Sequence, residues 1–431
     1  MRRYLLIMLC LVVTGCSAGR GGTPPDAEGA VQTSPLPQSN PSSRDAARAV
    51  TPHPQDGVGE TASALERLRV EPVARPVLLG SDTFISEPGT YVVEVSSRHT
   101  WQVGMVGERI TWSPVGDAFA TFGDGGLIVV RWAEGPAVRL YEGHVAAVAW
   151  SSDGRRIAFT VSSGNPGSES LQDGLYVVDR DGGHLTRLSE EKGINGILWQ
   201  SNGDHLVLLT VSGYAYLFDP NSKQMTRLPG TLTRDLVAWS PDGRRLAVGN
   251  PEGLMIFDSG TGDKWRVSDR PANRFVAWSP NGKAVLTGEA ISGLSRSIVL
   301  SWIDSVKGAD GWPLAVAFGN PTWDPSARRF GYVEDGCTSG TFDLHTTTAD
   351  RVRTRVTKSE HLKLRPLWSP LGSYIVFSSG NALMLADVTA PDERVLLKRS
   401  TTLPDPLLPI SWSPDGRFLA FYVADGSGVC D

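Results

Sequence analysis

The chain has 431 residues, 40% of them hydrophobic, and a formal net charge of −5. This mild acidity argues against a nucleic-acid-binding protein, which usually presents a strongly basic face. A chain of this length can form two or three ordinary domains or one large repeat domain, so internal repeats decide between the two.

Residues 1–15 have the features of a secretory signal peptide. Arg2 and Arg3 form a positive n-region, and the apolar run from Leu5 to Val13 is shorter than the roughly 20 residues that span a bilayer. The next residues, VTGCS at 13–17, resemble the lipobox of bacterial lipoproteins. The resemblance implies that Cys16 carries a diacylglycerol and becomes the first residue of the mature protein. An ordinary signal peptide with an incidental cysteine is the alternative.

Residues 16–76 are predicted to form the lipidated cysteine and a disordered tether. Pro, Ser, Gly, Thr and Ala dominate this segment, and apolar periodicity is lacking. Such a composition buries too little apolar surface to offset the entropy of ordering the chain. The folded domain is therefore expected over residues 77–431.

A tryptophan motif recurs along that domain. Its clearest copies read VAWSPDG at 237–243 and VAWSPNG at 276–282. The eight motif tryptophans are Trp112, Trp150, Trp199, Trp239, Trp278, Trp323, Trp368 and Trp412. The intervals between these tryptophans run from 38 to 49 residues, a period that indicates propeller blades of four strands each. We interpret these tryptophans as core residues that pack between neighbouring blades.

Each copy predicts the strands of its blade. The apolar residues before the tryptophan form an inner strand, and Ser-Pro-Asp-Gly is hairpin chemistry, since Pro presets φ and Gly accepts a positive φ. Asp153, Asp242 and Asp415 are accordingly expected to be turn formers. Two apolar strands follow, and a polar strand forms the outer edge, where polar residues deter pairing with other proteins.

These repeats resemble the WD-like repeats of TolB-type propellers over residues 89–424. The resemblance implies an all-β propeller and protein partners in the cell envelope. No Trp-Asp dipeptide ends a blade, which argues against the WD-repeat family proper.

The two ends of the domain determine the number of blades. After Trp412 the chain has room for one more strand, whereas residues 89–95 and 100–103 form two strands that precede the first motif. We therefore expect the N-terminal strands to complete the last blade, which closes the ring without an open edge. The prediction is an eight-bladed β-propeller, and a seven-bladed ring with one irregular blade is the alternative.

Candidate binding residues stand just before the inner strands, at the face where propellers usually bind ligands. They are Arg109, Arg234, Arg274, Asn320 and Arg365. The four arginines could form a cationic funnel for an acidic partner, or they could be solvated or paired with neighbours such as Glu108 and Asp235.

Two cysteines remain once Cys10 is removed with the signal and Cys16 is lipidated. Cys337 and Cys430 would lie in an oxidising compartment, and each follows the second strand of its blade, so both are expected on one face. We interpret them as a candidate disulfide, and two free thiols are the alternative.

The search for catalytic motifs finds no nucleophile elbow, no HExxH and no phosphate-binding loop. We therefore expect a non-catalytic binding or scaffold module without cofactor or metal. We expect a monomer that is anchored outside the cytoplasmic membrane and binds an envelope protein or glycan, with no nucleic acid as partner. The alternative is a propeller enzyme, a polysaccharide lyase or glycan hydrolase, with its site at the channel mouth.

Overall fold

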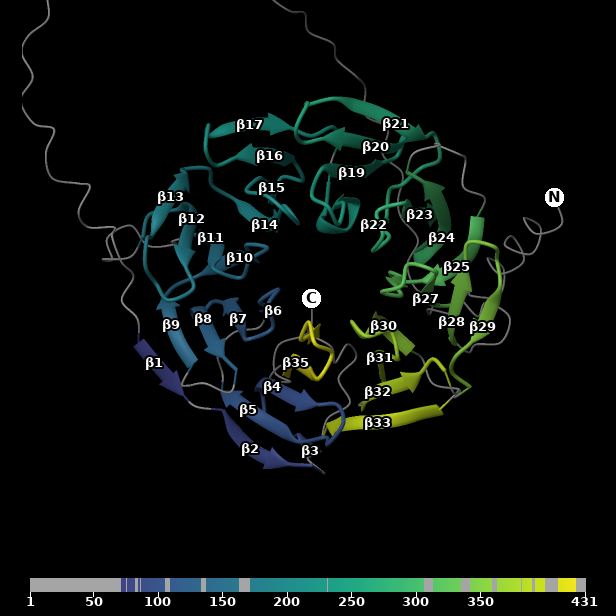
Figure 1. The fold of residues 1–431 in the computed structure, drawn as a ribbon, viewed down its shortest axis with the longest axis horizontal. Coiled ribbons are helices and arrows are strands. Elements are labelled where there is room, and N and C mark those ends of the chain that lie inside the picture. The colour runs from purple at the N-terminus through teal and green to yellow at the C-terminus, as the bar shows by residue number, and fades with distance from the viewer. Residues whose placement is uncertain are drawn as a thin grey trace, which may run out of the picture. The chain divides into compact units, whose positions relative to one another are not determined.

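The folded domain is a ring of eight β-sheets around a central channel, as seen in the computed structural model (Figure 1). The structure describes residues 71–423 except 75, 82–83, 86, 105–108, 133–136, 163–170, 231, 306–312, 335–341, 359–362, 381, 390–391 and 400–409. Among these residues no helix is long and apolar enough to cross a bilayer. The predicted eight-bladed all-β propeller is confirmed, and the seven-bladed alternative is excluded.

In each of blades 1 to 4 the strands follow one another from the channel outward. The strands of blades 1 and 2 are β6 (Arg109–Trp112), β7 (Ala118–Gly123), β8 (Gly126–Arg131), β9 (Ala137–Tyr141), β10 (Val145–Trp150), β11 (Arg156–Val161), β12 (Gly174–Asp179) and β13 (Thr186–Ser189). Those of blades 3 and 4 are β14 (Ile194–Trp199), β15 (Leu206–Thr210), β16 (Ala215–Asp219), β17 (Gln224–Arg227), β18 (Val237–Trp239), β19 (Arg245–Asn250), β20 (Gly253–Asp258) and β21 (Lys264–Ser268). A short 3-10 helix, η1 (Arg234–Leu236), precedes β18.

Blades 5 to 7 repeat this order. The strands of blades 5 and 6 are β22 (Phe275–Trp278), β23 (Ala284–Ile291), β24 (Leu294–Asp304), β25 (Pro313–Phe318), β26 (Thr322–Trp323), β27 (Arg329–Val333), β28 (Leu344–Thr348) and β29 (Arg353–Arg355). Those of blade 7 are β30 (Lys363–Trp368), β31 (Tyr374–Ser379), β32 (Ala382–Asp387) and β33 (Asp392–Arg399).

Blade 8 joins the two ends of the domain, as the sequence predicts. Its inner strands, β34 (Ser411–Trp412) and β35 (Phe418–Val423), come from the C-terminal end, whereas β4 (Gly89–Glu94) and β5 (Thr100–Gly104) come from the N-terminal end. Strand β35 pairs antiparallel with β4 in continuous register, and Leu419 lies opposite Val93. Both side chains are fully buried. The ring is therefore closed by hydrogen bonds between strands more than 300 residues apart in the sequence.

A belt of three short strands, residues 71–85, precedes blade 8. Strand β1 (Glu71–Ala74) pairs with the outer strand of blade 1, β2 (Val77–Gly80) with that of blade 8 and β3 (Phe84–Ile85) with that of blade 7. The belt thus covers the outer edges of three consecutive blades on both sides of the closure (Figure 1). Since β1 lies within residues 16–76, the expected boundary between tether and propeller is too late: regular structure is already present at Glu71.

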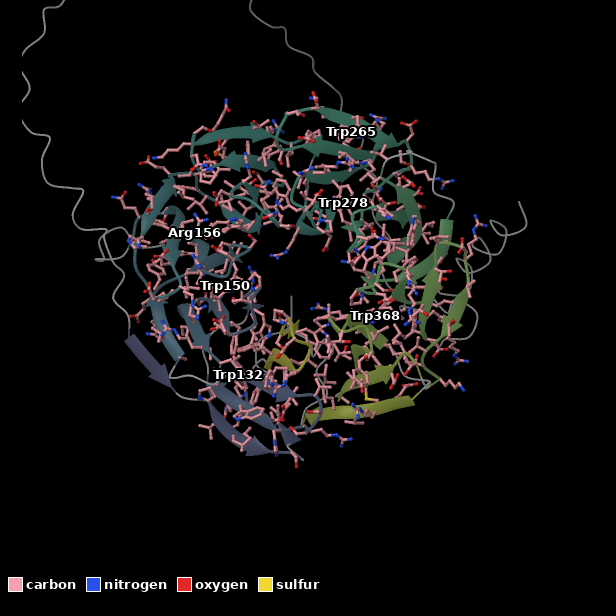
Figure 2. The ribbon with its side chains drawn as sticks, in the orientation of Figure 1. Trp132, Trp150, Arg156, Trp265, Trp278 and Trp368 are labelled. Carbon is pink, nitrogen blue, oxygen red and sulfur yellow. The ribbon has the colours of Figure 1, made fainter. Side chains whose placement is uncertain are left out.

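The motif tryptophans form the predicted core. Seven of them are buried, and Trp323 is half-buried. Figure 2 shows Trp150, Trp278 and Trp368 near the centre of the ring. Their indole N–H groups also link the blades, because six of the eight donate to the backbone carbonyl just before the tryptophan of the preceding blade. These bonds join Trp112 to Ser411 (2.9 Å), Trp150 to Thr111 (3.2 Å), Trp239 to Leu198 (3.4 Å), Trp278 to Ala238 (3.0 Å), Trp323 to Ala277 (3.3 Å) and Trp412 to Leu367 (3.4 Å).

Two blades depart from this pattern. Trp199 donates instead to Gly203 in its own hairpin (2.9 Å), and the buried Nε1 of Trp368 has no hydrogen-bond partner. Trp278 and Trp368 are similarly buried, at 7% and 4% exposure. The two side chains are packed alike but differ in this hydrogen bond. Variants at the two positions therefore isolate the contribution of the inter-blade hydrogen bond to stability.

Trp278→Phe is expected to lower the free energy of unfolding by about 1 kcal/mol more than Trp368→Phe, because only Trp278 loses a hydrogen bond and leaves a buried carbonyl without its donor. Urea-induced unfolding of the two variants checks this difference. Equal losses would show that the inter-blade hydrogen bond contributes nothing measurable.

The turn chemistry is also as predicted. The Ser240 hydroxyl donates to Asp242 Oδ1 (2.6 Å), which also accepts from the Arg244 backbone N–H (3.1 Å). The hydrogen bond from Ser240 is the main reason why the pKa of Asp242 is lowered. Gly243 completes the turn at φ +72°. Asp153 and Asp415 make the same serine contacts, so all three carboxylates are turn formers.

Candidate functional site

The five predicted channel residues lie at the beginning of the innermost part of their blades, and all five are exposed. They are Arg109 at the start of β6, Arg234 in η1, Arg274 just before β22, Asn320 shortly before β26 and Arg365 within β30. Because the innermost strands occupy equivalent positions around the ring, we expect these residues to lie toward one end of the channel. We call this set the arginine ring.

Two members of the arginine ring influence each other electrostatically. Although the Arg234 side chain is reached by solvent, protein surrounds it, and this reduced solvation lowers the pKa of its guanidinium. Asp235 offsets part of the shift, whereas repulsion by Arg109 adds to it. Arg109 belongs to blade 1 and Arg234 to blade 4, so this influence acts between residues of different blades.

Arg109 is held in place by its neighbours. Its Nη1 donates to the carbonyl of Ala146 in blade 2 (2.7 Å), and its guanidinium lies 6.0 Å from the centre of the Phe122 ring. The side chain therefore bridges the inner strands of two blades, which limits its freedom before any ligand binds.

The channel wall next to the arginine ring is uncharged. In all eight blades the residue before the motif tryptophan is half-buried. These residues are Thr111, Ala149, Leu198, Ala238, Ala277, Thr322, Leu367 and Ser411. Along the inner strands, the arginine ring is thus followed by small and aliphatic side chains.

A polar network between blades 6 and 7 was not found from the sequence. Lys363 is fully buried, and its Nζ lies 3.3 Å from Asp343 Oδ1. Arg355 contacts the other oxygen of Asp343 at 2.6 Å. At the position of Lys363, blades 2 and 3 carry the buried aliphatic residues Val145 and Ile194. A lysine five residues before a motif tryptophan is the signal that could have revealed the network.

His345 lies beside this network. Its Nδ1 accepts a hydrogen bond from Arg353 Nε (3.1 Å), and its Nε2 lies 3.2 Å from Glu334 Oε2. Arg353 also pairs with Glu334, and the imidazole stacks on Tyr332. The hydrogen bond that Nδ1 accepts requires this nitrogen to be unprotonated, which fits a neutral imidazole. Burial, together with the charge of Arg353, lowers the pKa of His345 to about 4.

This lowered pKa makes stability depend on pH. In the unfolded chain His345 binds a proton as the pH falls below 6.5, whereas in the folded protein it does so only near pH 4. Acidification through this window therefore favours unfolding, by up to roughly 3 kcal/mol.

Between pH 6.5 and pH 4, the free energy of unfolding of the His345→Gln variant is expected to fall less than that of the wild type, because the variant has no imidazole at this position to bind a proton. Urea titrations at both pH values test this, and parallel losses would contradict it.

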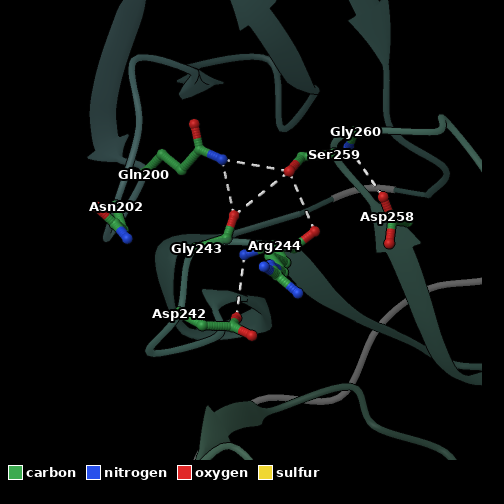
Figure 3. Close-up of a pocket in the computed structure, with 8 residues that line it drawn as sticks. All are labelled: Gln200, Asn202, Asp242, Gly243, Arg244, Asp258, Ser259 and Gly260. Carbon is green, nitrogen blue, oxygen red and sulfur yellow. Dashed lines mark hydrogen bonds between the residues drawn. The ribbon is translucent and has the colours of Figure 1, made fainter.

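A cavity of about 340 Å³ lies at the opposite end of the inner strands, between blades 3 and 4 (Figure 3). Gln200, which replaces the motif serine, donates from Nε2 to the Gly243 carbonyl (2.7 Å) and to Ser259 Oγ (3.2 Å). Its Oε1 accepts from the His205 backbone N–H (3.0 Å). The polar groups of Gln200 are thus engaged in joining two blades, which indicates a structural role.

Other predicted site residues lie outside the described part of the chain, namely Cys16, Cys337 and Cys430. The lipid attachment and the disulfide therefore stay predictions. Among the described residues, no group of three or more His, Cys, Asp and Glu side chains is arranged to hold a metal ion.

Comparison with known proteins relates the chain to propeller proteins of several kinds. The family model of eukaryotic translation initiation factor eIF2A matches residues 139–294, which is less than half of the chain. No curated protein matches. Among solved structures, a putative TolB from Agrobacterium tumefaciens is 14% identical, with 79% of this chain and 100% of that chain covered and a TM-score of 0.40.

Two enzymes are similar to a comparable degree. An oligogalacturonate lyase in complex with manganese is 14% identical, with 75% of this chain and 99% of that chain covered and a TM-score of 0.47. Dipeptidyl peptidase 4 of Porphyromonas gingivalis is 12% identical, with 67% of this chain and 53% of that chain covered and a TM-score of 0.49. At these levels none of the similarities assigns an activity to the chain.

Proposed function

We propose that the protein is a non-catalytic binding module, held outside the cytoplasmic membrane by a lipid on Cys16, which binds an acidic segment of another envelope protein at the arginine ring. The observation that carries this proposal is that four exposed arginines stand at the beginning of the innermost part of blades 1, 4, 5 and 7. Several cations presented by one face attract an anionic ligand and are stabilised by it.

The breadth of the site supports a macromolecular ligand. The four arginines come from blades 1, 4, 5 and 7, so a ligand that contacts all of them extends over most of the channel mouth. An extended acidic segment can reach several blades at once, whereas a single small anion satisfies one or two guanidinium groups.

An acidic protein segment fits better than a glycan. Sugar rings are commonly bound on open aromatic faces, yet each of the two exposed large aromatic side chains in the described part of the chain, Tyr214 and Trp265, carries an arginine over its ring. Arg227 lies over the Tyr214 ring at 4.0 Å, and Arg245 lies over the Trp265 ring at 5.9 Å. Each cation–π contact takes up one face on which a sugar would stack.

The proposed location has a direct test. Cys16→Ser removes the residue that would be acylated, and acyl chains anchor a protein through burial of about 0.8 kcal/mol per CH₂. We expect the variant in the soluble extracytoplasmic fraction and the wild type in the membrane fraction. Wild-type and variant protein in the same fraction would contradict lipid anchoring.

The proposed function is tested by capture from detergent-solubilised envelope with the lipidated protein as bait. The expected partner is a protein with an exposed acidic segment, bound at about 0.05 M salt and released at about 0.5 M, because salt screens charge pairs that are reached by solvent. Capture that survives high salt, or that is competed by acidic polysaccharide rather than by acidic peptide, would contradict the proposal. Depolymerisation of the polysaccharide would instead support the enzyme alternative.

A further inference from the structure

The backbone of Arg365 has an unusual conformation. Its φ is +49°, in the left-handed region, and it lies inside a strand, β30. Five other described residues that are not glycine have a positive φ, and all five lie in connections between strands: Arg98, His184, Lys223, Ala327 and Arg351. Turns require such conformations, but a strand does not.

This conformation is strained for two reasons. A side chain with a Cβ is disfavoured in the left-handed region because the Cβ approaches the following carbonyl group. The next residue is Pro366, and the ring of a proline further restricts the residue before it, which prefers an extended conformation. Strain of this kind persists only where the surrounding structure enforces it, and it concentrates at functional sites.

A strand bulge does not by itself explain the strain. The pairing of β30 with β31 shifts register between Leu364 and Leu367. The inner strands of blades 2 and 3 shift register at equivalent places, within residues 145–148 and 194–196. Neither segment contains a residue with positive φ. The bulges of blades 2 and 3 therefore form without the left-handed conformation that blade 7 has at Arg365.

The conformation separates two cationic side chains. In a regular strand residues i and i+2 point to the same face, so Lys363 and Arg365 would share one environment. Instead, Lys363 is fully buried against Asp343, whereas Arg365 is exposed on the innermost strand. The left-handed residue breaks the alternation. One cation thereby enters the network between the blades, and the other stays exposed on the innermost strand.

We propose that Arg365 is the main specificity-determining residue for carboxylate groups at the arginine ring, presented to the ligand by a backbone conformation that costs stability. This inference rests on the proposed function, and it adds that Arg365 contributes more to the affinity for carboxylate groups than the other arginines of the ring. It predicts a trade-off, because the substitution that relieves the strain also removes the binding group.

Three variants test the proposal. Arg365→Gly removes the cation and the strain, Arg365→Ala removes the cation alone, and Arg274→Ala removes a ring cation whose backbone is unstrained. The probe is a fluorescently labelled decamer of glutamate, followed by anisotropy. Both Arg365 variants are expected to bind at least about tenfold more weakly, a loss typical of a charged hydrogen bond, and Arg274→Ala less than about threefold. Arg365→Gly is expected to melt roughly 1–3 °C above Arg365→Ala.

The outcomes separate the inference from the function on which it rests. If the wild type does not bind the decamer, the proposed function fails and the inference fails with it. If the wild type binds and Arg365→Ala binds equally well, only the role of Arg365 is overturned. If Arg365→Gly is no more stable than Arg365→Ala, the strained presentation is overturned.

Discussion

Removal of residues 65–104 is expected to unfold the whole propeller, although only blade 8 takes two of its four main strands from these residues. Without β4 and β5, blade 8 keeps only β34 and β35, and an isolated pair of strands is at best marginally stable. The ring then has an open seam on either side of this pair. The belt over blades 7, 8 and 1 is lost as well.

The burial lost at the seam is large compared with the stability of a domain. Val92, Val93, Leu419 and Ala420 are all fully buried where β4 meets β35. A fully buried aliphatic side chain contributes about 1.5–3 kcal/mol, and the net stability of a domain is only about 5–15 kcal/mol. Losing these contacts together with those of the belt is therefore expected to remove most of that stability.

Circular dichroism and urea-induced unfolding test this prediction. The control is a chain that begins at Leu65, the first residue of the compact unit that contains the propeller. It is expected to unfold cooperatively with the midpoint of the full chain. A chain lacking residues 65–104 that shows the same midpoint would contradict closure by the N-terminal strands.

The fold could be predicted from the sequence because its determinants are local and repeated. Each blade carries its own tryptophan and its own turn, and serine, aspartate and glycine act within a few residues of one another, as Ser240 and Asp242 show. The closure was predictable for a different reason. Two strands without a blade at one end of the domain match a blade without its outer strands at the other end.

The belt could not be predicted from the sequence, because its strands have little hydrophobic pattern of their own. Strands β1, β2 and β3 contain four, four and two residues, and they form because blade edges offer unpaired backbone groups. Val77 and Leu78 are 60% and 54% exposed. The belt therefore lacks the alternation of buried apolar and exposed polar residues by which a strand is recognised in a sequence.

The candidate site could be predicted only in part. The motif predicts which residues come just before an inner strand, and Arg109 and Arg274 are exposed at the start of β6 and just before β22. The network of Asp343, His345 and Lys363 depends on contacts between strands of different blades, which no linear pattern reports. The left-handed backbone at Arg365 likewise leaves no sequence signal beyond the following proline.

Charge reversal at the channel mouth has the second large expected effect. Arg109→Glu, Arg274→Glu and Arg365→Glu together replace three cations by three anions. With an average of about 1 kcal/mol for the three solvent-accessible charges, of which Arg365 contributes most, the combined loss is about 3 kcal/mol, or roughly 100-fold in affinity. The repulsion that the reversed side chains add makes this a lower bound.

A matched control exists at the other end of the inner strands. Arg155, Arg244 and Lys283 are exposed and follow the hairpin turns of blades 2, 4 and 5. Changing all three to Glu alters the net charge by the same amount as the channel triple variant, but away from the arginine ring. A general effect of net charge would weaken both triple variants equally.

The most direct measurement is therefore the affinity of the glutamate decamer for the wild type and for the two triple variants at one salt concentration. We expect at least roughly 100-fold weaker binding by the channel variant and unchanged binding by the control variant. Equal losses in the two variants, or binding by the channel variant at wild-type affinity, would contradict the claim that the arginine ring is the binding site.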